Sequence, residues 1–193
     1  MSFNTIERNR QRQNLDQHDS LWLFGYGSLI FKADFPYIER RPATIDGWVR
    51  RFWQGSHDHR GTPDAPGRVV TLIRAPGETC LGMAYHVSPK VFDHLDVREK
   101  NGYLRFTTPM TFMDGDHADG LVYIATEDNA AFLGPAPESE IAGQIAHSHG
   151  PSGPNHEYLL RLADALRELE VHDPHVFTIE RHLKDILMQP GVH

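Results

Sequence analysis

The spacing of apolar residues changes once along this chain, and that change limits the folds open to it. Between Leu21 and about Thr126 short apolar runs are separated by Gly, Pro and Asp clusters, which is typical of strands. From Pro137 onward apolar residues recur at helical spacing, as in the stripe Leu159, Leu162, Leu166 and Leu169. Strands first and helices afterwards predict an α+β domain with a largely antiparallel or mixed sheet, either open or closed as a small barrel with flanking helices.

A short helix is predicted inside the strand half. Ser88 is a suitable N-cap, Pro89 suits the first helical position, and Val91, Phe92 and Leu95 share one face. The helical pattern ends between Asp96 and Glu99, before a turn at Asn101 and Gly102. Two carboxylates are therefore expected close to the C-terminus of this helix.

Length and composition favour one globular domain over residues 21–189, preceded by a polar arm over residues 1–20 that packs little. The longest apolar runs are too short to predict a membrane span. A formal net charge of −7 argues against a nucleic-acid partner. Cys80 is the single cysteine, so no intrachain disulfide is possible, and a cytoplasmic protein is expected. The oligomeric state is not indicated.

Glycine interrupts the first apolar strand, in the run Gly25-Tyr26-Gly27-Ser28 within LWLFGYGSLIF. Ile30 stands where a dinucleotide fingerprint needs its third glycine, and a P-loop lysine is missing. Tyr26 and Ile30 also occupy the positions that a nucleophile elbow reserves for glycine. Two interpretations remain: backbone N–H groups that hold a small anion or oxyanion beside an aromatic wall from Tyr26, or a tight turn without a ligand.

Asp96 and Glu99 are candidates for proton transfer. Carboxylates near the negative end of a helix dipole are expected to have raised pKa values, which suits acid–base chemistry. The alternative is that both are merely solvated acids. Cys80 lies in CLGMAYHV, where a small core residue fits better than a nucleophile.

The 13 histidines do not predict a metal site. His57 and His59 flank Asp58, but no H-E-x-x-H or similar spacing supplies further ligands. A polar loop braced by hydrogen bonds from Arg60 and Arg68 is the better interpretation. No cofactor is indicated.

Five segments together resemble the ChaC family of glutathione-specific γ-glutamylcyclotransferases. They are LFGYGSLI, RRFWQGSHDHRGTPDAPGRVVTLI, HLDVREKNGY, FLGPAP and GPSGPNHEYL, and the similarity runs from about Trp22 to about Leu183. The resemblance implies a γ-glutamylcyclotransferase-like fold around a small barrel, and cleavage of glutathione to 5-oxoproline and cysteinylglycine. His57, where the family more often has threonine, and Pro154, which replaces a frequent arginine, depart from the family pattern.

The resemblance also implies roles for particular residues. Glu99 matches the family's proton acceptor, and the substrate's γ-glutamyl part is expected at Leu23, Phe24, Gly25, Tyr26, Gly27, Ser28 and Leu29. The α-amine of a γ-glutamyl amide can attack its own γ-carbonyl, so neither metal nor covalent residue is needed. We expect glycine in the loop because it lets the backbone approach a small zwitterion closely.

Other residues could shape the pocket or, equally, brace a hydrogen-bonded loop: Arg50, Arg51, Gln54, Asp58, His59 and Arg60. Tyr103 and Tyr123 could line the cavity or belong to the core. Three alternatives to glutathione cleavage stay open at this point. They are a cyclotransferase for other γ-glutamyl amino acids or amines, a non-catalytic γ-glutamyl-binding protein, and a histidine-based metal hydrolase.

Overall fold

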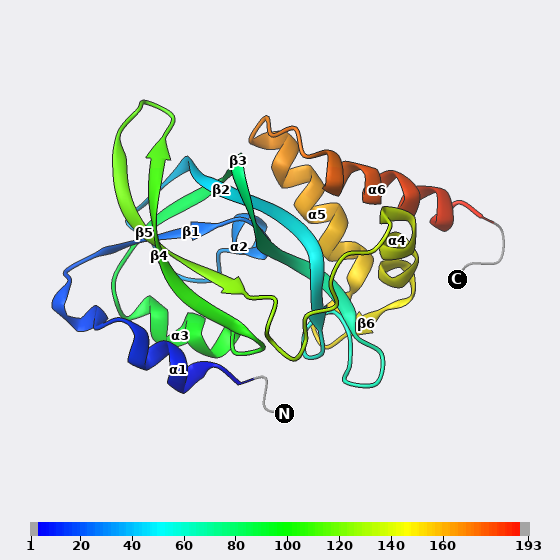
Figure 1. Cartoon of the computed structure of the whole chain (residues 1–193), viewed down its shortest axis with the longest axis horizontal. Helices are drawn as coiled ribbons and strands as arrows, with labels where there is room; N and C mark the ends of the chain where they lie inside the picture. The colour runs from blue at the N-terminus through cyan, green and yellow to red at the C-terminus, as the bar shows by residue number, and fades with distance from the viewer. Residues whose placement is uncertain (1–3, 190–193) are drawn as a thin grey trace. The chain divides into compact units, whose positions relative to one another are not determined.

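A computed structural model describes residues 4–189, and Figure 1 shows the arrangement of its elements along the chain. The first half contains α1 Ile6–Arg12, the 3-10 helix η1 Leu15–Gln17, β1 Leu21–Gly25, α2 Ser28–Phe31, β2 Glu39–Ser56, β3 Gly67–Val87 and α3 Val91–Arg98. The second half contains β4 Tyr103–Phe112, β5 His117–Ala125, α4 Glu138–His147, β6 His149–Gly150, β7 Gly153–Pro154, α5 Asn155–Glu168 and α6 Pro174–Leu187.

Five strands close into a barrel in the order β1-β3-β2-β4-β5. β1 is antiparallel to β3 but parallel to β5, through the pair Leu23 and Leu121, while β4 and β5 form an antiparallel hairpin. Closure leaves no long open edge on either side of β1. The predicted α+β class with a small mixed barrel and helices is therefore confirmed.

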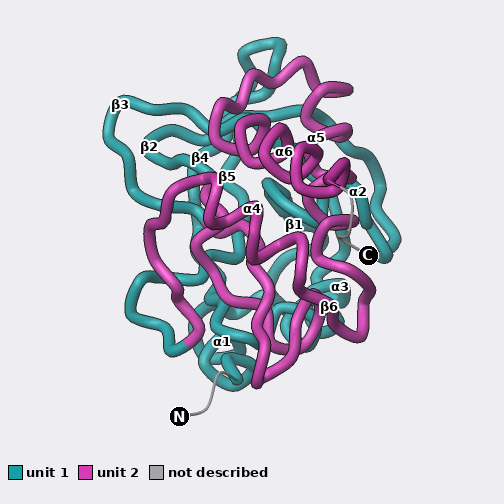
Figure 2. Tube along the Cα trace, turned by 90° about the vertical axis from the view of Figure 1, so that its right-hand side faces the viewer, with its two compact units in different colours: residues 1–50, 72–130 teal, residues 51–71, 131–193 magenta. Residues whose placement is uncertain are grey.

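The chain divides into two compact units, which Figure 2 distinguishes by colour. Unit 1 contains residues up to 50 together with 72–130, and unit 2 contains 51–71 together with the chain from 131 onward. β2 and β3 both pass from one unit into the other along the chain. One folding domain over residues 21–189 stays a prediction.

The core of unit 1 is built on β1 and its neighbour β3. Leu23, Phe24 and Tyr85 are completely buried, because β1 is apolar on both faces and is paired on both sides. β3 is one continuous strand that passes through Gly77 at φ +88°, although the sequence predicts that Gly and Pro clusters separate the strands. Cys80 is buried, as predicted for a core residue.

The described part of the N-terminal arm packs more than predicted. Helix α1 lies beside α3 and against β4 (Figure 1), and Thr5 and Asn9 are both buried. The prediction of an arm with little packing is wrong for these residues. The reason is that Asn9, polar in sequence, satisfies main-chain groups of β4.

Helix α3 begins later than predicted. It starts at Val91 with Lys90 as its N-cap, while Ser88 and Pro89 form a preceding turn in which Ser88 Oγ accepts from Lys90 N at 3.4 Å. Its end is as predicted, with Glu99 as C-cap and Gly102 at φ +93°. The two carboxylates therefore do lie at the C-terminus of α3.

Unit 2 is organised around helices α4, α5 and α6, which pack on one another. Three leucines of the predicted stripe, Leu159, Leu162 and Leu166, are fully buried on α5, whereas Leu169 is the half-buried C-cap. Asp173 caps α6 by accepting a hydrogen bond from Val176 N at 3.1 Å. Within residues 4–189 no helix has the length and apolar character to cross a bilayer.

Candidate active site

The glycine loop follows the C-terminal end of β1, as predicted. Leu23 and Phe24 are 0% exposed and are paired with β3, so in this structure they support the loop from within β1. Ser28 is half-buried, and it opens the short helix α2, which the sequence did not predict. Tyr85 Oη donates to Leu29 O at 2.7 Å and so fixes this helix on β3.

Packing within the fold explains why position 25 is glycine. A Cβ atom on Gly25 would lie 2.8 Å from Leu29 Cβ, and one on Gly82 of β3 would lie 2.2 Å from Gly25 O. Packing of α2 and β3 around the strand end is thus sufficient to require glycine at both positions. Close approach of a substrate, the reason expected from the sequence, is not needed to explain Gly25.

Tyr26 does not form the predicted aromatic wall. Its side chain is 6% exposed, and its hydroxyl donates to Tyr123 O at 2.5 Å. Tyr123 is buried too, in agreement with the core alternative for this residue. Tyr26 therefore ties the glycine loop to β5 rather than offering its ring to a ligand.

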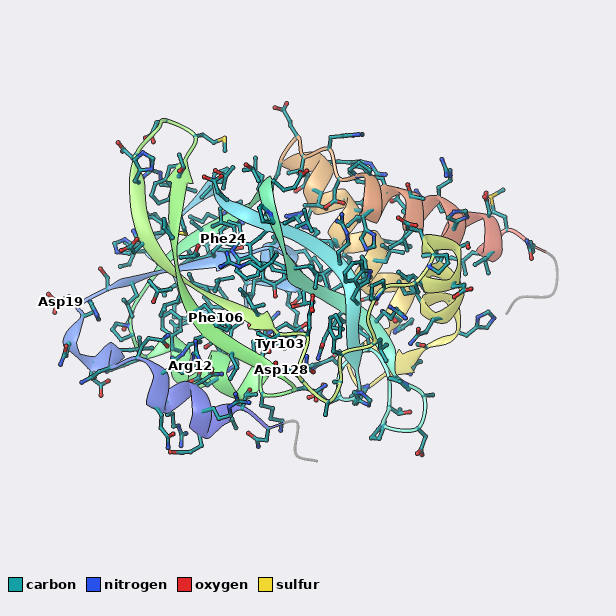
Figure 3. The ribbon with its side chains drawn as sticks, viewed as in Figure 1. Arg12, Asp19, Phe24, Tyr103, Phe106 and Asp128 are labelled. Atoms are coloured by element: carbon teal, nitrogen blue, oxygen red, sulfur yellow. The ribbon has the colours of Figure 1, made fainter. Side chains whose placement is uncertain are left out.

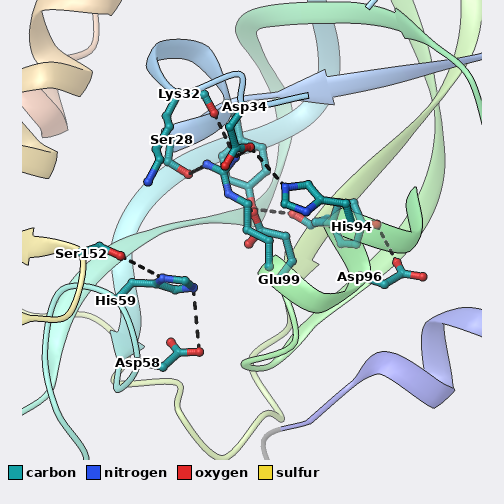
Figure 4. A network of polar contacts seen from close by, with 12 residues as sticks. Ser28, Lys32, Asp34, Asp58, His59, His94, Asp96, Glu99 and Ser152 are labelled. Carbon is teal, nitrogen blue, oxygen red and sulfur yellow. Dashed lines mark hydrogen bonds and ion pairs between the residues drawn. The ribbon is translucent and has the colours of Figure 1, made fainter. Parts of the chain in front are cut away.

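Arg98 connects the glycine loop to Glu99. Its Nη2 donates to Ser28 Oγ at 3.0 Å, and its Nε lies 3.6 Å from Glu99 Oε1. Its Nη1 donates to Lys32 O at 2.9 Å and to Asp34 Oδ1 at 2.6 Å (Figure 4). One guanidinium thus contacts both parts of the predicted site.

Asp34 completes this cluster together with His94. Burial alone favours a higher pKa for Asp34, but the charge of Arg98 and the contact with His94, 3.5 Å away, outweigh burial and hold its pKa below the usual value. Sequence reasoning missed Arg98, Asp34 and His94. The only available signal for Arg98 was its position beside Glu99.

Glu99 lies beside this cluster and is only partly exposed to solvent. Its side chain is 16% exposed, and its main-chain N–H donates to Leu95 O at 2.8 Å, so its position follows directly from the end of α3. Its charge also contributes to a raised pKa of Tyr123, for which burial and Asp96 are the larger causes. A carboxylate at this place is both held by the protein and partly open to solvent.

Asp96, the other candidate, occupies a different environment. It is buried, accepts from Tyr123 Oη at 2.6 Å, and lies 3.5 Å from Arg105 Nη1. Burial raises its pKa despite the opposing effects of Tyr123 and Arg105. The predicted direction is confirmed for Asp96, but burial is the largest cause, rather than the helix dipole. Asp96 is a core group, which leaves Glu99 as the accessible acid.

The chain is similar to known proteins in both sequence and structure. The family model described as ChaC-like protein matches residues 21–186. This chain belongs to the ChaC-like family. The match includes the glycine loop, Arg98 and Glu99, whereas α1 lies outside it.

Relatives of this ChaC-like chain cover most of its length. Gamma-glutamylcyclotransferase 2-3 of Arabidopsis thaliana is 45% identical over 182 residues, 88% of this chain and 92% of the relative. Glutathione-specific gamma-glutamylcyclotransferase 1 of Danio rerio is 46% identical over 175 residues, 85% and 89% of the two chains. The crystal structure of a selenomethionine-labelled γ-glutamyl cyclotransferase specific to glutathione from yeast has a TM-score of 0.81 at 33% identity, and covers 87% of this chain and 97% of that one.

The histidine-containing ChaC motif lies in unit 2, where it forms a hydrogen-bonded loop. His59 Nδ1 lies 3.2 Å from Ser152 Oγ, and His59 O accepts from Ser152 N at 2.9 Å (Figure 4). Arg60 is buried and donates to Pro154 O at 3.1 Å and to Glu157 at 3.4 Å. These contacts agree with the loop-bracing alternative. Within residues 4–189 no group of three or more His, Cys, Asp or Glu side chains could hold a metal ion.

Proposed function

We propose that this ChaC-like protein cleaves glutathione to 5-oxoproline and cysteinylglycine. The single observation that carries the proposal is the Arg98 guanidinium, which contacts both Ser28 of the glycine loop and the Glu99 carboxylate within unit 1. The names of the Danio rerio relative and of the yeast structure support glutathione as the substrate.

Cyclisation needs positioning and proton transfer more than it needs an added nucleophile. The substrate α-nitrogen attacks the γ-carbonyl carbon, a five-membered lactam forms, and the bond from that carbon to the cysteine nitrogen breaks. Two protons leave the α-ammonium in this process, and the departing nitrogen gains two to become an ammonium. Glu99 transfers one of these protons from the attacking nitrogen to the departing nitrogen, while the α-ammonium loses the other to water before attack and the released amine regains it from water.

The glycine loop is assigned to the γ-glutamyl part of the substrate. Completely buried Leu23 and Phe24 support this loop from within β1, whereas half-buried Ser28 can contribute its hydroxyl to the substrate. Gly25, Tyr26, Gly27 and Leu29 also contribute main chain, since Tyr26 turns its hydroxyl toward Tyr123. A substrate α-carboxylate or the tetrahedral oxyanion would accept from these N–H groups.

Glu99→Gln tests the assignment, because the amide keeps the size of the side chain but cannot take a proton. We expect 5-oxoproline release from glutathione to fall by about 10²- to 10⁴-fold, with glutathione binding largely retained. Glu78→Gln, at an exposed position of β3, is the matched control and should behave as wild type. Near wild-type turnover by Glu99→Gln would show that another group is the base.

Parallel substrates separate the alternatives. Product formation from glutathione but not from γ-glutamyl-alanine supports strict glutathione use, and equal rates with both support a broader γ-glutamyl specificity. A thermal shift with glutathione and no 5-oxoproline from the wild-type protein would indicate a binding protein and overturn the proposed reaction.

A further inference from the structure

The N-terminal residues 4–13 contact the main chain that directly follows Glu99. Thr5 N donates to Lys100 O at 2.9 Å, and Thr5 Oγ1 lies 3.1 Å from Lys100 O and 3.5 Å from Glu99 O. Asn4 forms an isolated β-bridge with Asn101. Because Glu99 is the C-cap of α3, the path of residues 99–101 decides where its carboxylate points.

Asn9 extends this contact to the first residues of β4. It is 0% exposed, its Nδ2 donates to Tyr103 O at 3.0 Å, and its Oδ1 accepts from Arg105 N at 2.8 Å. The side-chain amide thus hydrogen-bonds to one main-chain carbonyl and one main-chain N–H of β4, as the main chain of a neighbouring strand would. Tyr103 is thereby held two residues after the Asn101 bridge.

Arg12 completes the contact with β4. Its Nε donates to Arg105 O at 2.6 Å, and its guanidinium lies 4.3 Å from the centre of the Phe106 ring. Figure 3 labels Arg12, Tyr103 and Phe106, which lie close together where α1 meets β4. Residues 4–13 are therefore fixed at both ends, by Thr5 to the turn after α3 and by Arg12 to β4.

A chain of buried polar contacts leads from Asn9 to the glycine loop. Arg105, 2% exposed, donates to Asn9 O and faces Asp96 at 3.5 Å. Asp96 accepts from Tyr123 Oη, and Tyr123 O accepts from Tyr26 Oη. These residues are all buried, so Asn9 and the glycine loop belong to one connected network of polar contacts.

We propose that residues 4–13, the positioning segment, set the Glu99 carboxylate for proton transfer, with Thr5 and Asn9 as positioning residues. This inference rests on the proposed function and adds to it, because the family match begins only at residue 21. The segment touches neither substrate nor reacting atoms in this proposal. It acts by fixing the main chain on either side of the turn after Glu99.

Thr5 offers a matched pair of variants in the full-length chain. Thr5→Val keeps the side-chain shape but removes the hydroxyl donor to the carbonyls of Lys100 and Glu99, whereas Thr5→Ser keeps the donor. We expect Thr5→Val to lower kcat by about tenfold with KM within about twofold, since a displacement near 1 Å can cost up to about 10²-fold. Thr5→Ser should restore kcat. Arg8→Ala, at an exposed position of α1, is the control for the helix and should match wild type.

Asn9→Leu probes the same segment from the other end. It leaves Tyr103 O and Arg105 N without the amide, so we expect both a lower melting temperature and a loss of kcat larger than that of Thr5→Val. Assays are made well below the melting temperature of each variant. A Thr5→Val or Asn9→Leu enzyme with wild-type kcat and KM, whatever its stability, overturns the positioning role.

Hydrogen exchange separates failure of this inference from failure of the proposed function. Amides of residues 99–105 should exchange faster in Thr5→Val than in wild type or Thr5→Ser, whether or not the protein forms 5-oxoproline. Unchanged exchange in both Thr5→Val and Asn9→Leu contradicts the inference. If wild type does not cleave glutathione, the proposed function fails on its own assay, and the role in proton transfer fails with it.

Discussion

Arg98 in unit 1 and Arg68 in unit 2 are both largely buried, yet they serve different purposes. Arg68 donates to Phe52 O at 2.9 Å, to Gly134 O at 3.2 Å and to Gln144 Oε1 at 2.7 Å. Arg98 instead contacts one main-chain carbonyl, a serine hydroxyl and two carboxylates. An arginine bound to neutral acceptors maintains a loop, whereas one beside accessible carboxylates can order a reacting group.

The largest expected loss of stability in this comparison comes from Arg68→Met. The carbonyls of Phe52 and Gly134 lose a buried donor, so we expect the free energy of unfolding to fall by about 3 kcal/mol. Denaturant unfolding measures this change, and kcat/KM per folded molecule should stay within about twofold of wild type. Arg181→Met, at an exposed position of α6, is the control. A stable but inactive Arg68→Met enzyme would contradict the view that Arg68 serves stability and Arg98 serves activity.

Arg98→Met should produce the opposite pattern. The stem is kept, but Ser28 and Glu99 lose the group that connects them, so we expect kcat/KM for glutathione to fall by about 100-fold. The free energy of unfolding should change by only about 1 kcal/mol, since the partner Asp34 is partly exposed. Arg98→Lys should have an intermediate kcat/KM, because one ammonium group cannot make all the hydrogen bonds of the planar guanidinium. Activity within threefold of wild type in Arg98→Met contradicts the assigned role.

These two arginines also show what the sequence could and could not predict. Periodicity and turn residues located β1, the end of α3 and the helices of unit 2, because those patterns depend on local spacing. The partners of Arg98 are up to 70 residues away, so no spacing rule could pair it with Ser28. The same holds for Asn9, whose burial depends on β4, about 96 residues later. Local sequence patterns therefore predict helices and strands. The candidate site depends on contacts between residues far apart in the sequence, which those patterns do not predict.

His175 shows how unit 2 responds to acid. Burial and the charge of Arg51 lower its pKa from 6.5 to about 4, against the opposing effects of Asp173 and Glu138, and its neutral Nε2 accepts from Phe52 N at 3.0 Å. The unfolded chain therefore binds a proton below pH 6.5 that the folded chain takes up only near pH 4. Stability from this group is complete above pH 6.5 and is lost as the pH falls toward 4, by about 3 kcal/mol.

His175→Gln removes this titration and keeps an acceptor for Phe52 N. Denaturant unfolding between pH 7 and pH 4 should show a shallower decline for the variant than for wild type. His182→Gln, on the same helix α6, is the comparison for a general effect of removing one histidine. Equal declines in wild type and His175→Gln would show that unit 2 does not rely on this neutral imidazole.

The smallest expected effect comes from Asp34→Asn in unit 1. Arg98 keeps its contacts with Lys32 O and Ser28 Oγ in this variant, so we expect kcat/KM to fall by only about threefold. Because the folded pKa of Asp34 is lowered, its contribution to stability is present at neutral pH and is lost as the pH falls through that lowered value. Asp34 is partly exposed, so this contribution should be within about 1 kcal/mol in denaturant unfolding at pH 7. A loss as large as that of Arg98→Met would mean that the Asp34 carboxylate, and not Lys32 O at the C-cap of α2, holds the guanidinium between Ser28 and Glu99.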